Sequence, residues 1–194
     1  MEGSIFIAGA GVQWLRDKIK FFKTAPETEK IVKSLKDNNN IYLVPAFTGL
    51  GAPYWDANAR GVLSGITRDT SPKEIVRATI EAVAYQTYDL FEAMKHDGLR
   101  PKIVKVDGGM VMNNWFSQFL SDIVNVKVLR PKVQETTALG AAFMAGLHIG
   151  IYKSLKDISK NWSLDKKFSP KMKNSKRKTL ITGWEKAIQR SLIT

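Results

Sequence analysis

Two short glycine turns, each followed by an amide side chain, carry the residue types best suited to hold a nucleotide. The first turn is residues 9–11 (GAG), with Gln13 just past it, and the second is residues 107–109 (DGG), with Asn113 past it. Glycine leaves the main chain bare, so a flat base or a ribose can lie against it, and an amide offers both a donor and an acceptor. If both turns lie at one edge of a sheet, both can contact the same ligand.

The same turns also have a plain structural interpretation. A Gly-Gly turn between a strand and a helix is more often only a turn, and Gln13 is equally well explained as an exposed residue on a first helical turn. The sequence has no Gly-x-x-x-x-Gly-Lys-Ser/Thr pattern, and no Gly-x-Gly-x-x-Gly pattern opens a helix after a strand, which excludes a P-loop and a dinucleotide fingerprint. Spacing alone leaves nucleotide binding and simple turns both open.

Strands and helices flank both turns. The sequence predicts a strand over residues 3–8 before the first turn and a helix through residues 12–19 after it. It predicts a strand over residues 102–106 before the second turn and a helix that starts near Asn113. Ligands of open α/β sheets bind at the carboxyl ends of strands, and the free N–H groups of a helix N-terminus favour anions. This order predicts an α/β domain with a ligand site at that edge.

Other segments must support this edge. A serine-proline start with a glutamate three residues after the serine predicts a capped helix over residues 71–94. Residues 41–44 are typical of a buried strand, and the aromatic residues within 45–56 favour an ordered loop. Residues 138–146 form a helix of small side chains, which we expect to be buried against a neighbouring element. A last amphipathic helix runs through residues 187–192.

The net charge of +12 is concentrated in one part of the chain. Residues 151–194 carry 12 Lys or Arg against three acidic residues, a net charge of +9, and residues 1–150 carry only +3. The densest run, residues 166–178, lacks the interleaved aromatics that stack on bases. We expect this run to face water, so nucleic acid is not the expected partner, although a basic module that binds polyanions remains an alternative.

Composition narrows the remaining classes of site. The chain has no cysteine, and its two histidines, His96 and His148, are too isolated to form a metal cage, so no metal site is predicted. No apolar run reaches the roughly 20 residues that a membrane span needs. No secretory signal is seen at the start of the sequence, so a soluble cytoplasmic protein is expected.

Four stretches of the sequence are distinctive: residues 8–17 (AGAGVQWLRD), 44–56 (VPAFTGLGAPYWD), 107–114 (DGGMVMNN) and 135–142 (ETTALGAA). They resemble the C-terminal half of glycerol kinases in the FGGY carbohydrate-kinase family. The resemblance covers nearly all of residues 2–150 and thins beyond them. It implies an actin-like, ribonuclease-H-like ATPase fold, with a mixed sheet and helices packed on it. Residues 1–150 would form the nucleotide-binding lobe, and residues 151–194 a basic extension packed on the same domain.

The resemblance also implies how the chemistry is divided. ATP with Mg²⁺ is the expected phosphoryl donor and glycerol the acceptor; Gly9 and Gln13 would contact the nucleotide, while Gly109 and Asn113 would hold its adenosine part. Family members place the glycerol contacts and the catalytic base in an N-terminal half, upstream of these residues. No catalytic residue is therefore assigned here, and this chain alone is expected to be inactive, because phosphoryl transfer needs all these groups aligned.

Several alternatives stay open. The chain could be half of another FGGY sugar kinase, or a structural piece that acts by docking on a separate N-terminal lobe. A homo-oligomer is an open outcome for a lobe that exposes apolar surface. Two carboxylates lie in the motif loops: Asp56 is interpreted as a hydrogen-bond acceptor within its loop, and Asp107 as a turn residue or an indirect contact to metal or water.

Overall fold

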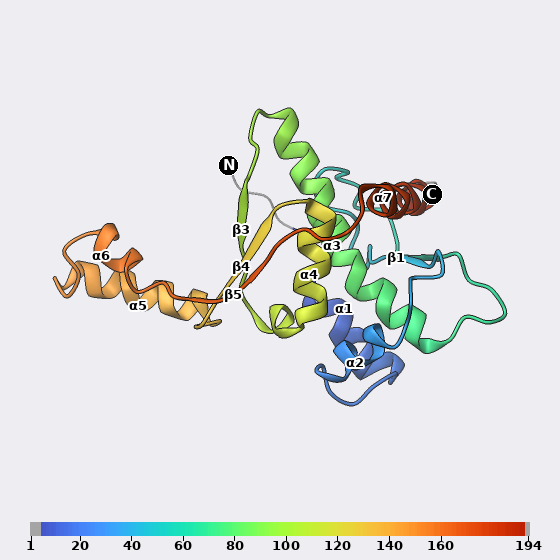
Figure 1. The fold of residues 1–194 in the computed structure, drawn as a ribbon, viewed down its shortest axis with the longest axis horizontal. Coiled ribbons are helices and arrows are strands. Elements are labelled where there is room, and N and C mark those ends of the chain that lie inside the picture. Colours follow the sequence, from blue (N-terminus) through green and yellow to red (C-terminus); the bar gives the residue numbers. More distant parts are fainter. Residues whose placement is uncertain (1–4, 193–194) are drawn as a thin grey trace.

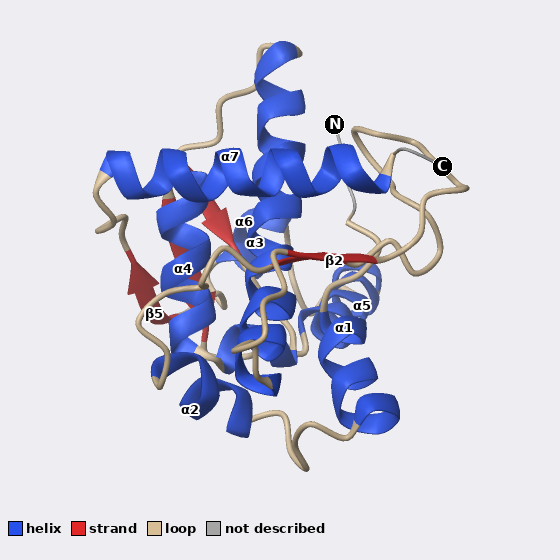
Figure 2. Ribbon diagram, turned by 90° about the vertical axis from the view of Figure 1, so that its right-hand side faces the viewer, coloured by secondary structure: helices blue, strands red, loops and turns tan. Residues whose placement is uncertain are grey.

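The computed structural model describes residues 5–192, and one long helix, α3 (Pro72–His96), runs through its centre (Figure 1). Helix α4 (Asn114–Val124) and strand β1 (Tyr42–Val44) pack on α3. Helix α7 (Asn174–Ser191) lies across α3 in Figure 2 and contacts β1 and α4. The core therefore joins segments that are far apart in the sequence.

Helix α3 begins where its sequence predicts. The Ser71 hydroxyl accepts from Lys73 N at 3.3 Å, and the Glu74 carboxylate accepts from Ser71 N at 3.0 Å, which completes a capping box in front of Pro72. These bonds satisfy N–H groups that have no partner within the helix. The predicted cap is confirmed.

The strands form two small sheets. In the first, β1 pairs antiparallel with β2 (Val62–Ser64). In the second, β3 (Ile103–Lys105) pairs parallel with β4 (Lys127–Pro131), and β4 pairs antiparallel with β5 (Leu164–Phe168). The predicted mixed sheet with helices packed on it is confirmed.

The start of the described chain differs from the prediction. Residues 5–8 form no strand, and positions 3 and 4 of the predicted strand lie outside the described residues. Helix α1 (Gly9–Trp14) begins at Gly9, so the glycines form its first turn instead of a break, and a π-helical turn (Leu15–Ile19) continues it. Gly11 faces α3, where an added Cβ would lie 3.0 Å from the Thr79 side chain. Glycine here therefore lets the helix pack closely on α3.

The loop over residues 45–56 is ordered, as predicted. Leu50 and Asp56 exchange backbone hydrogen bonds of 2.7 and 3.1 Å, and the Phe47 ring packs on Trp14 with centroids 5.0 Å apart. The Asp56 carboxylate accepts from Asn58 N and Ala59 N at 2.8 and 3.1 Å. This carboxylate is therefore a loop hydrogen-bond acceptor, as expected.

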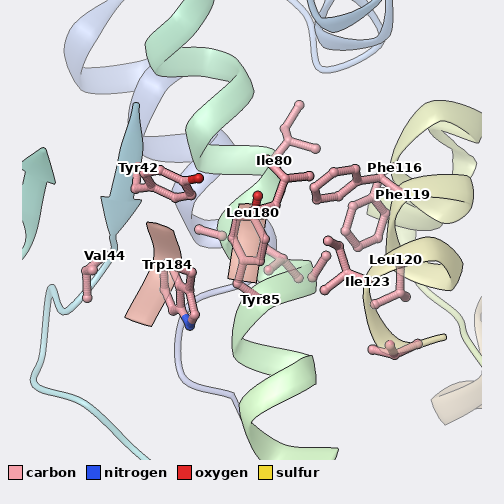
Figure 3. Packing of buried hydrophobic residues seen from close by; sticks show 14 of the residues in the cluster. Tyr42, Val44, Ile80, Tyr85, Phe116, Phe119, Leu120, Ile123, Leu180 and Trp184 are labelled. Carbon is pink, nitrogen blue, oxygen red and sulfur yellow. The ribbon is translucent and has the colours of Figure 1, made fainter. Parts of the chain in front are cut away.

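An aromatic cluster ties α7 to α3 and α4 (Figure 3). Trp184 is fully buried and stacks on Tyr85 at 5.3 Å, and Tyr85 meets the edge of Phe119 at 5.7 Å. The Trp184 indole N–H donates to the Asp89 carboxylate at 2.7 Å. Aromatic burial of this kind contributes strongly to stability, so the basic C-terminal region takes part in the core.

The core also contains an ion pair. Arg77 and Glu81 lie one turn apart on α3, and both side chains are buried. The Arg77 Nε atom is 2.7 Å from Glu81 Oε1. Arg77 donates to Leu35 O at 2.8 Å, and the Tyr85 hydroxyl donates to Glu81 at 3.0 Å. Because both charges have further hydrogen-bond partners, their burial is tolerated.

Helices α5 (Thr136–His148) and α6 (Leu155–Ser159) stand away from the other helices, on the far side of the second sheet (Figure 1). The expected burial of the small-residue helix is wrong for the described residues. Within α5 only Gly146 is buried, against Tyr152 from the turn that follows. The remaining small side chains of α5 are exposed or half-buried. No helix in the described part of the chain has the length and apolar character to cross a membrane.

Candidate functional site

A cavity of about 340 Å³ lies where α1, α3, α2 (Glu27–Lys33) and the 3₁₀ turn Gly109–Met112 meet. Its lining includes Gly9 and Gln13 from α1, Gly109 from the 3₁₀ turn, and Asn113 at the start of α4. Two glycine turns about a hundred residues apart therefore face the same space. The structure brings all four predicted residues together.

Both glycines leave open space at the cavity. A Cβ built on Gly9 or Gly109 would meet no atom within 4 Å. The neighbouring Gly108 has a φ of +83°, a left-handed conformation that favours glycine, and its N–H donates to Gln134 O at 3.2 Å. Gly108 therefore shapes the turn, while Gly109 keeps room for a ligand.

The amide of Asn113 is already hydrogen bonded. Its Oδ1 caps α4 by accepting from Phe116 N at 3.0 Å, and its Nδ2 donates to the Thr28 hydroxyl at 3.3 Å. Thr28 in turn donates to Ala25 O at 2.6 Å. The sequence expectation of a freely available donor and acceptor therefore needs correction: this amide is fixed at the cavity wall by its capping role.

The N-terminus of α4 is less open to anions than expected. Besides the Asn113 cap, the Glu29 carboxylate from α2 accepts from Asn114 N at 3.3 Å and pairs with Lys33. Burial opposes ionisation, but hydrogen bonds from Lys33 and Asn114 lower the pKa of Glu29 below its ordinary value. A charged carboxylate thus occupies this helix end, so the expectation of free N–H groups for an anion is wrong there.

The lining combines an apolar surface with one cation. Val12, Ile80 and Met110 contribute apolar side chains, and Arg16 follows Gln13 by three residues. Arg16 is held by its neighbour Asp17 through two contacts of 2.7 and 2.9 Å. The cavity can therefore accept a flat apolar group together with polar or charged substituents.

Three polar residues of the lining, Arg16, Thr28 and Glu29, were not predicted from the sequence. Arg16 had a usable signal, since three positions along a helix return to the same face as Gln13. Thr28 and Glu29 had none, because they reach Asn113 and Asn114 across 85 residues of sequence. Only the fold brings α2 to this place.

The two motif carboxylates lie elsewhere. Neither Asp56 nor Asp107 belongs to the described lining of the cavity. Asp107 is exposed in its turn. Among residues 5–192, no three or more His, Cys, Asp or Glu side chains are grouped so that they could hold a metal ion.

A family model matches most of the chain. The model of the C-terminal domain of the FGGY family of carbohydrate kinases matches residues 1–149. The matched range contains every residue that lines the cavity.

Individual relatives agree with this match. Glycerol kinase 1 of Pseudomonas aeruginosa is 56% identical over 190 residues, which is 98% of this chain and 38% of that protein. A glycerol kinase of Clostridium botulinum is 52% identical over 193 residues, covering 99% of this chain and 39% of the relative. The chain thus spans about two fifths of the length of these relatives.

Solved structures give the same result. The crystal structure of Plasmodium falciparum glycerol kinase with ADP superposes with a TM-score of 0.87 at 39% identity, over 99% of this chain and 38% of that one. A ligand-bound xylulose kinase from Lactobacillus acidophilus superposes with a TM-score of 0.78 at 25% identity, over 96% of this chain and 38% of that one. The fold is that of the actin-like ATPases. The two relatives named above, at 56% and 52% identity, are glycerol kinases, and the chain belongs to the FGGY family of carbohydrate kinases, matching its C-terminal domain.

Proposed function

We propose that this chain is the nucleotide-binding part of an ATP-dependent glycerol kinase, which transfers a phosphoryl group from ATP to glycerol and yields glycerol 3-phosphate and ADP. One observation carries the proposal: the cavity gathers Gly9, Gln13, Gly109 and Asn113 from two distant motifs. A glycerol kinase relative of known structure was solved with ADP, which supports a nucleotide as the ligand.

The chemistry of the lining supports a particular orientation of the nucleotide. The cavity volume of about 340 Å³ lies within the range of small-molecule sites. The charged Glu29 beside Asn113 disfavours a phosphate there and suits the adenosine part, whose amino and hydroxyl groups can donate. The phosphates would then extend toward Gln13 and Arg16, whose amide and remaining guanidinium N–H groups can donate to them.

Magnesium is part of the proposed function. Mg²⁺ usually keeps several waters and binds substrate phosphates with one or two carboxylates, and it neutralises charge on those phosphates. The described residues offer no grouped set of ligands, but such a phosphate-centred ion does not require one. We therefore assign the ion to the nucleotide phosphates and to carboxylates of a longer polypeptide.

The remaining groups of the reaction are proposed to come from the rest of such a longer polypeptide, because the relatives are more than twice as long as this chain. That portion would supply the glycerol contacts and the general base. Residues 1–150 would form the nucleotide lobe, and residues 151–194 would be a basic extension of the same domain. We also propose a cytoplasmic location.

A binding experiment with a matched pair of glycine variants tests the proposal. Gly109→Trp fills the open space at the cavity, while Gly140→Trp adds the same side chain at another open glycine, on α5. ADP titrated by calorimetry should bind the unchanged chain and Gly140→Trp alike, and its affinity for Gly109→Trp should fall at least about tenfold, which is roughly 1.4 kcal/mol.

Activity provides an independent check. This chain alone should show no glycerol-dependent ATP turnover, because half of the site aligns nothing. Equal ADP affinity in both tryptophan variants would refute the assignment of the cavity. Turnover of glycerol by the chain alone would refute the division of labour.

A further inference from the structure

A second hollow, of about 580 Å³, lies between α7 and the β1–β2 pair, and it shares no lining residue with the first cavity. Its described lining includes Lys178, Lys186 and Arg190, and no acidic side chain. The two hollows therefore differ in chemistry: the first is largely apolar, and the second is polar and cationic.

The three cations share one side of α7. At 1.5 Å per residue, Lys186 and Arg190 lie about 12 and 18 Å along the helix from Lys178. None of them forms an ion pair with an acidic residue in the described part of the chain. Lys186 and Arg190 are four residues apart, a spacing at which like charges repel. An anion bound between them would relieve this repulsion.

Other cations of the basic region are used differently. Lys166 donates to Asn114 Oδ1 at 3.0 Å, and the Arg177 guanidinium donates to Ile123 O at 2.7 Å. These side chains bind the C-terminal segment to α4. The basic region therefore has structural cations and, in this hollow, a separate set without such contacts among the described residues.

Two glycines shape the floor of the hollow. A Cβ at Gly183 would overlap the Tyr42 hydroxyl, so glycine lets this phenol reach α7. Gly65 has a φ of +85°, and a Cβ there would overlap Asn40 O. Burial raises the pKa of Tyr42, so its hydroxyl stays protonated.

A buried hydroxyl lies on the strand next to Tyr42, outside the described lining of the hollow. Ser64 is directly opposite Tyr42 in the β1–β2 pair, so the two side chains share one face. Ser64 is only 8% exposed, and its hydroxyl has no hydrogen-bond partner among residues 5–192. A buried polar group without a partner is costly and calls for an explanation.

We propose that this hollow binds a compact phosphate-bearing anion with at least two negative charges. Lys186 and Arg190, one helical turn apart, and the hydroxyl and amide groups of the lining match the oxygens of a compact phosphate group, and the described lining has no carboxylate to repel them. The lining contains one aromatic side chain, Tyr42, which is too few for stacking successive bases, so a nucleic acid strand is not favoured.

The test uses the whole chain and inorganic pyrophosphate as the probe, without ADP, because ADP also carries a diphosphate and would compete for the hollow. Calorimetry at about 150 mM salt should detect one saturable site, since weak surface attraction is largely screened there. Lys186→Gln with Arg190→Gln should weaken binding at least tenfold. The control pair Lys171→Gln and Lys173→Gln removes the same charge outside the hollow and should change the affinity less than twofold.

A steric variant separates shape from charge. Thr182 is exposed and lines the hollow, so Thr182→Trp should block it without changing the net charge, and pyrophosphate affinity should again fall at least tenfold. A parallel titration with an alkyl phosphate identifies the source: tighter pyrophosphate binding indicates a diphosphate, and tighter alkyl phosphate binding indicates a phosphate ester.

Three results would overturn the proposal. They are the absence of saturable pyrophosphate binding, an equal loss of affinity in the control pair, and tighter binding of an oligoglutamate peptide that is sensitive to the same variants. The last result would assign the hollow to an acidic protein segment instead.

Discussion

The region around α3 buries its large apolar side chains, whereas the α5–α6 segment leaves several of them exposed. Around α3, large side chains such as Trp184 are fully buried. In and near α5, Met144 is 55% exposed and Ile151 is 67% exposed. The candidate nucleotide cavity is lined only from the first region within the described chain. The candidate site is thus formed by the well-packed region around α3, and not by the exposed helices α5 and α6.

The largest expected difference between the regions is in stability. Trp184→Ala removes a buried aromatic side chain and its hydrogen bond to Asp89, so the free energy of unfolding should fall by about 4 kcal/mol. Met144→Ala, on exposed α5, should change it by less than about 0.5 kcal/mol. Urea unfolding followed by circular dichroism measures both. Similar losses would erase the contrast between the two regions.

A buried and an exposed ion pair on the same helix, α3, allow the effect of burial on stability to be compared directly. Glu81→Ala leaves the Arg77 charge buried without its carboxylate, and the expected loss is about 3 kcal/mol. Glu92→Ala breaks the pair with Lys95, which is substantially exposed, and should cost less than about 1 kcal/mol. Urea midpoints of the two variants provide the comparison. A small effect of Glu81→Ala would mean that Arg77 finds water or another partner.

Asp89 should make the core sensitive to pH. Burial raises its pKa to about 7, against hydrogen bonds from Trp184 and Tyr54 that favour the charged form, and nearby Glu185 and Glu92 raise it further. Because the folded-state pKa is raised, this contribution to stability is fully present below the unfolded-state pKa of about 4 and is lost progressively as the pH rises to about 7.

Asp89→Asn isolates this effect, because asparagine can still accept from Trp184. Between pH 5 and pH 8 the unchanged chain should lose about 2 kcal/mol more stability than Asp89→Asn. Urea unfolding at both pH values gives the difference. An equal change in the free energy of unfolding for both proteins would show that Asp89 keeps the same charge throughout this range.

A smaller loss of stability than for the buried groups above is expected at the cavity wall. Asn113→Ala removes the cap of α4 and the bond to Thr28, at a cost of about 1 kcal/mol. It should also weaken ADP binding, because the wall that we propose to hold the adenosine part loses its fixed amide. Asn113→Asp keeps a capping oxygen and should restore most of the stability, while its charge still weakens ADP binding. Thermal unfolding with and without ADP separates the two roles.

Features that depend on residues close together in the sequence were predictable. The capping box at Ser71 lies within four residues, so the start of α3 was predictable. Both glycine turns were visible as motifs, and their family resemblance linked them to one site. By contrast, the contact of Glu29 with Asn114 spans 85 residues, so the closure of the α4 N-terminus could not be predicted from spacing.

Burial was the least predictable property. Arg77 and Glu81 have the spacing of an ordinary surface pair on a helix. Both are nevertheless buried, with hydrogen bonds to Leu35 and Tyr85. The small residues of α5 suggested a buried helix, but a sequence pattern does not specify which element would cover that face. Residues 5–8 similarly have strand-like composition and pair with no strand in the described structure.

Mapping ADP binding residue by residue tests the central claim most directly. In amide NMR spectra recorded during an ADP titration, the largest shifts should fall on Gly9, Gln13, Gly109 and Asn113, with little change in α5. The Gly109→Trp variant should lose these shifts at the same ADP concentration. Shifts confined to the hollow lined by Lys178, Lys186 and Arg190 would contradict the assignment of the nucleotide to the first cavity.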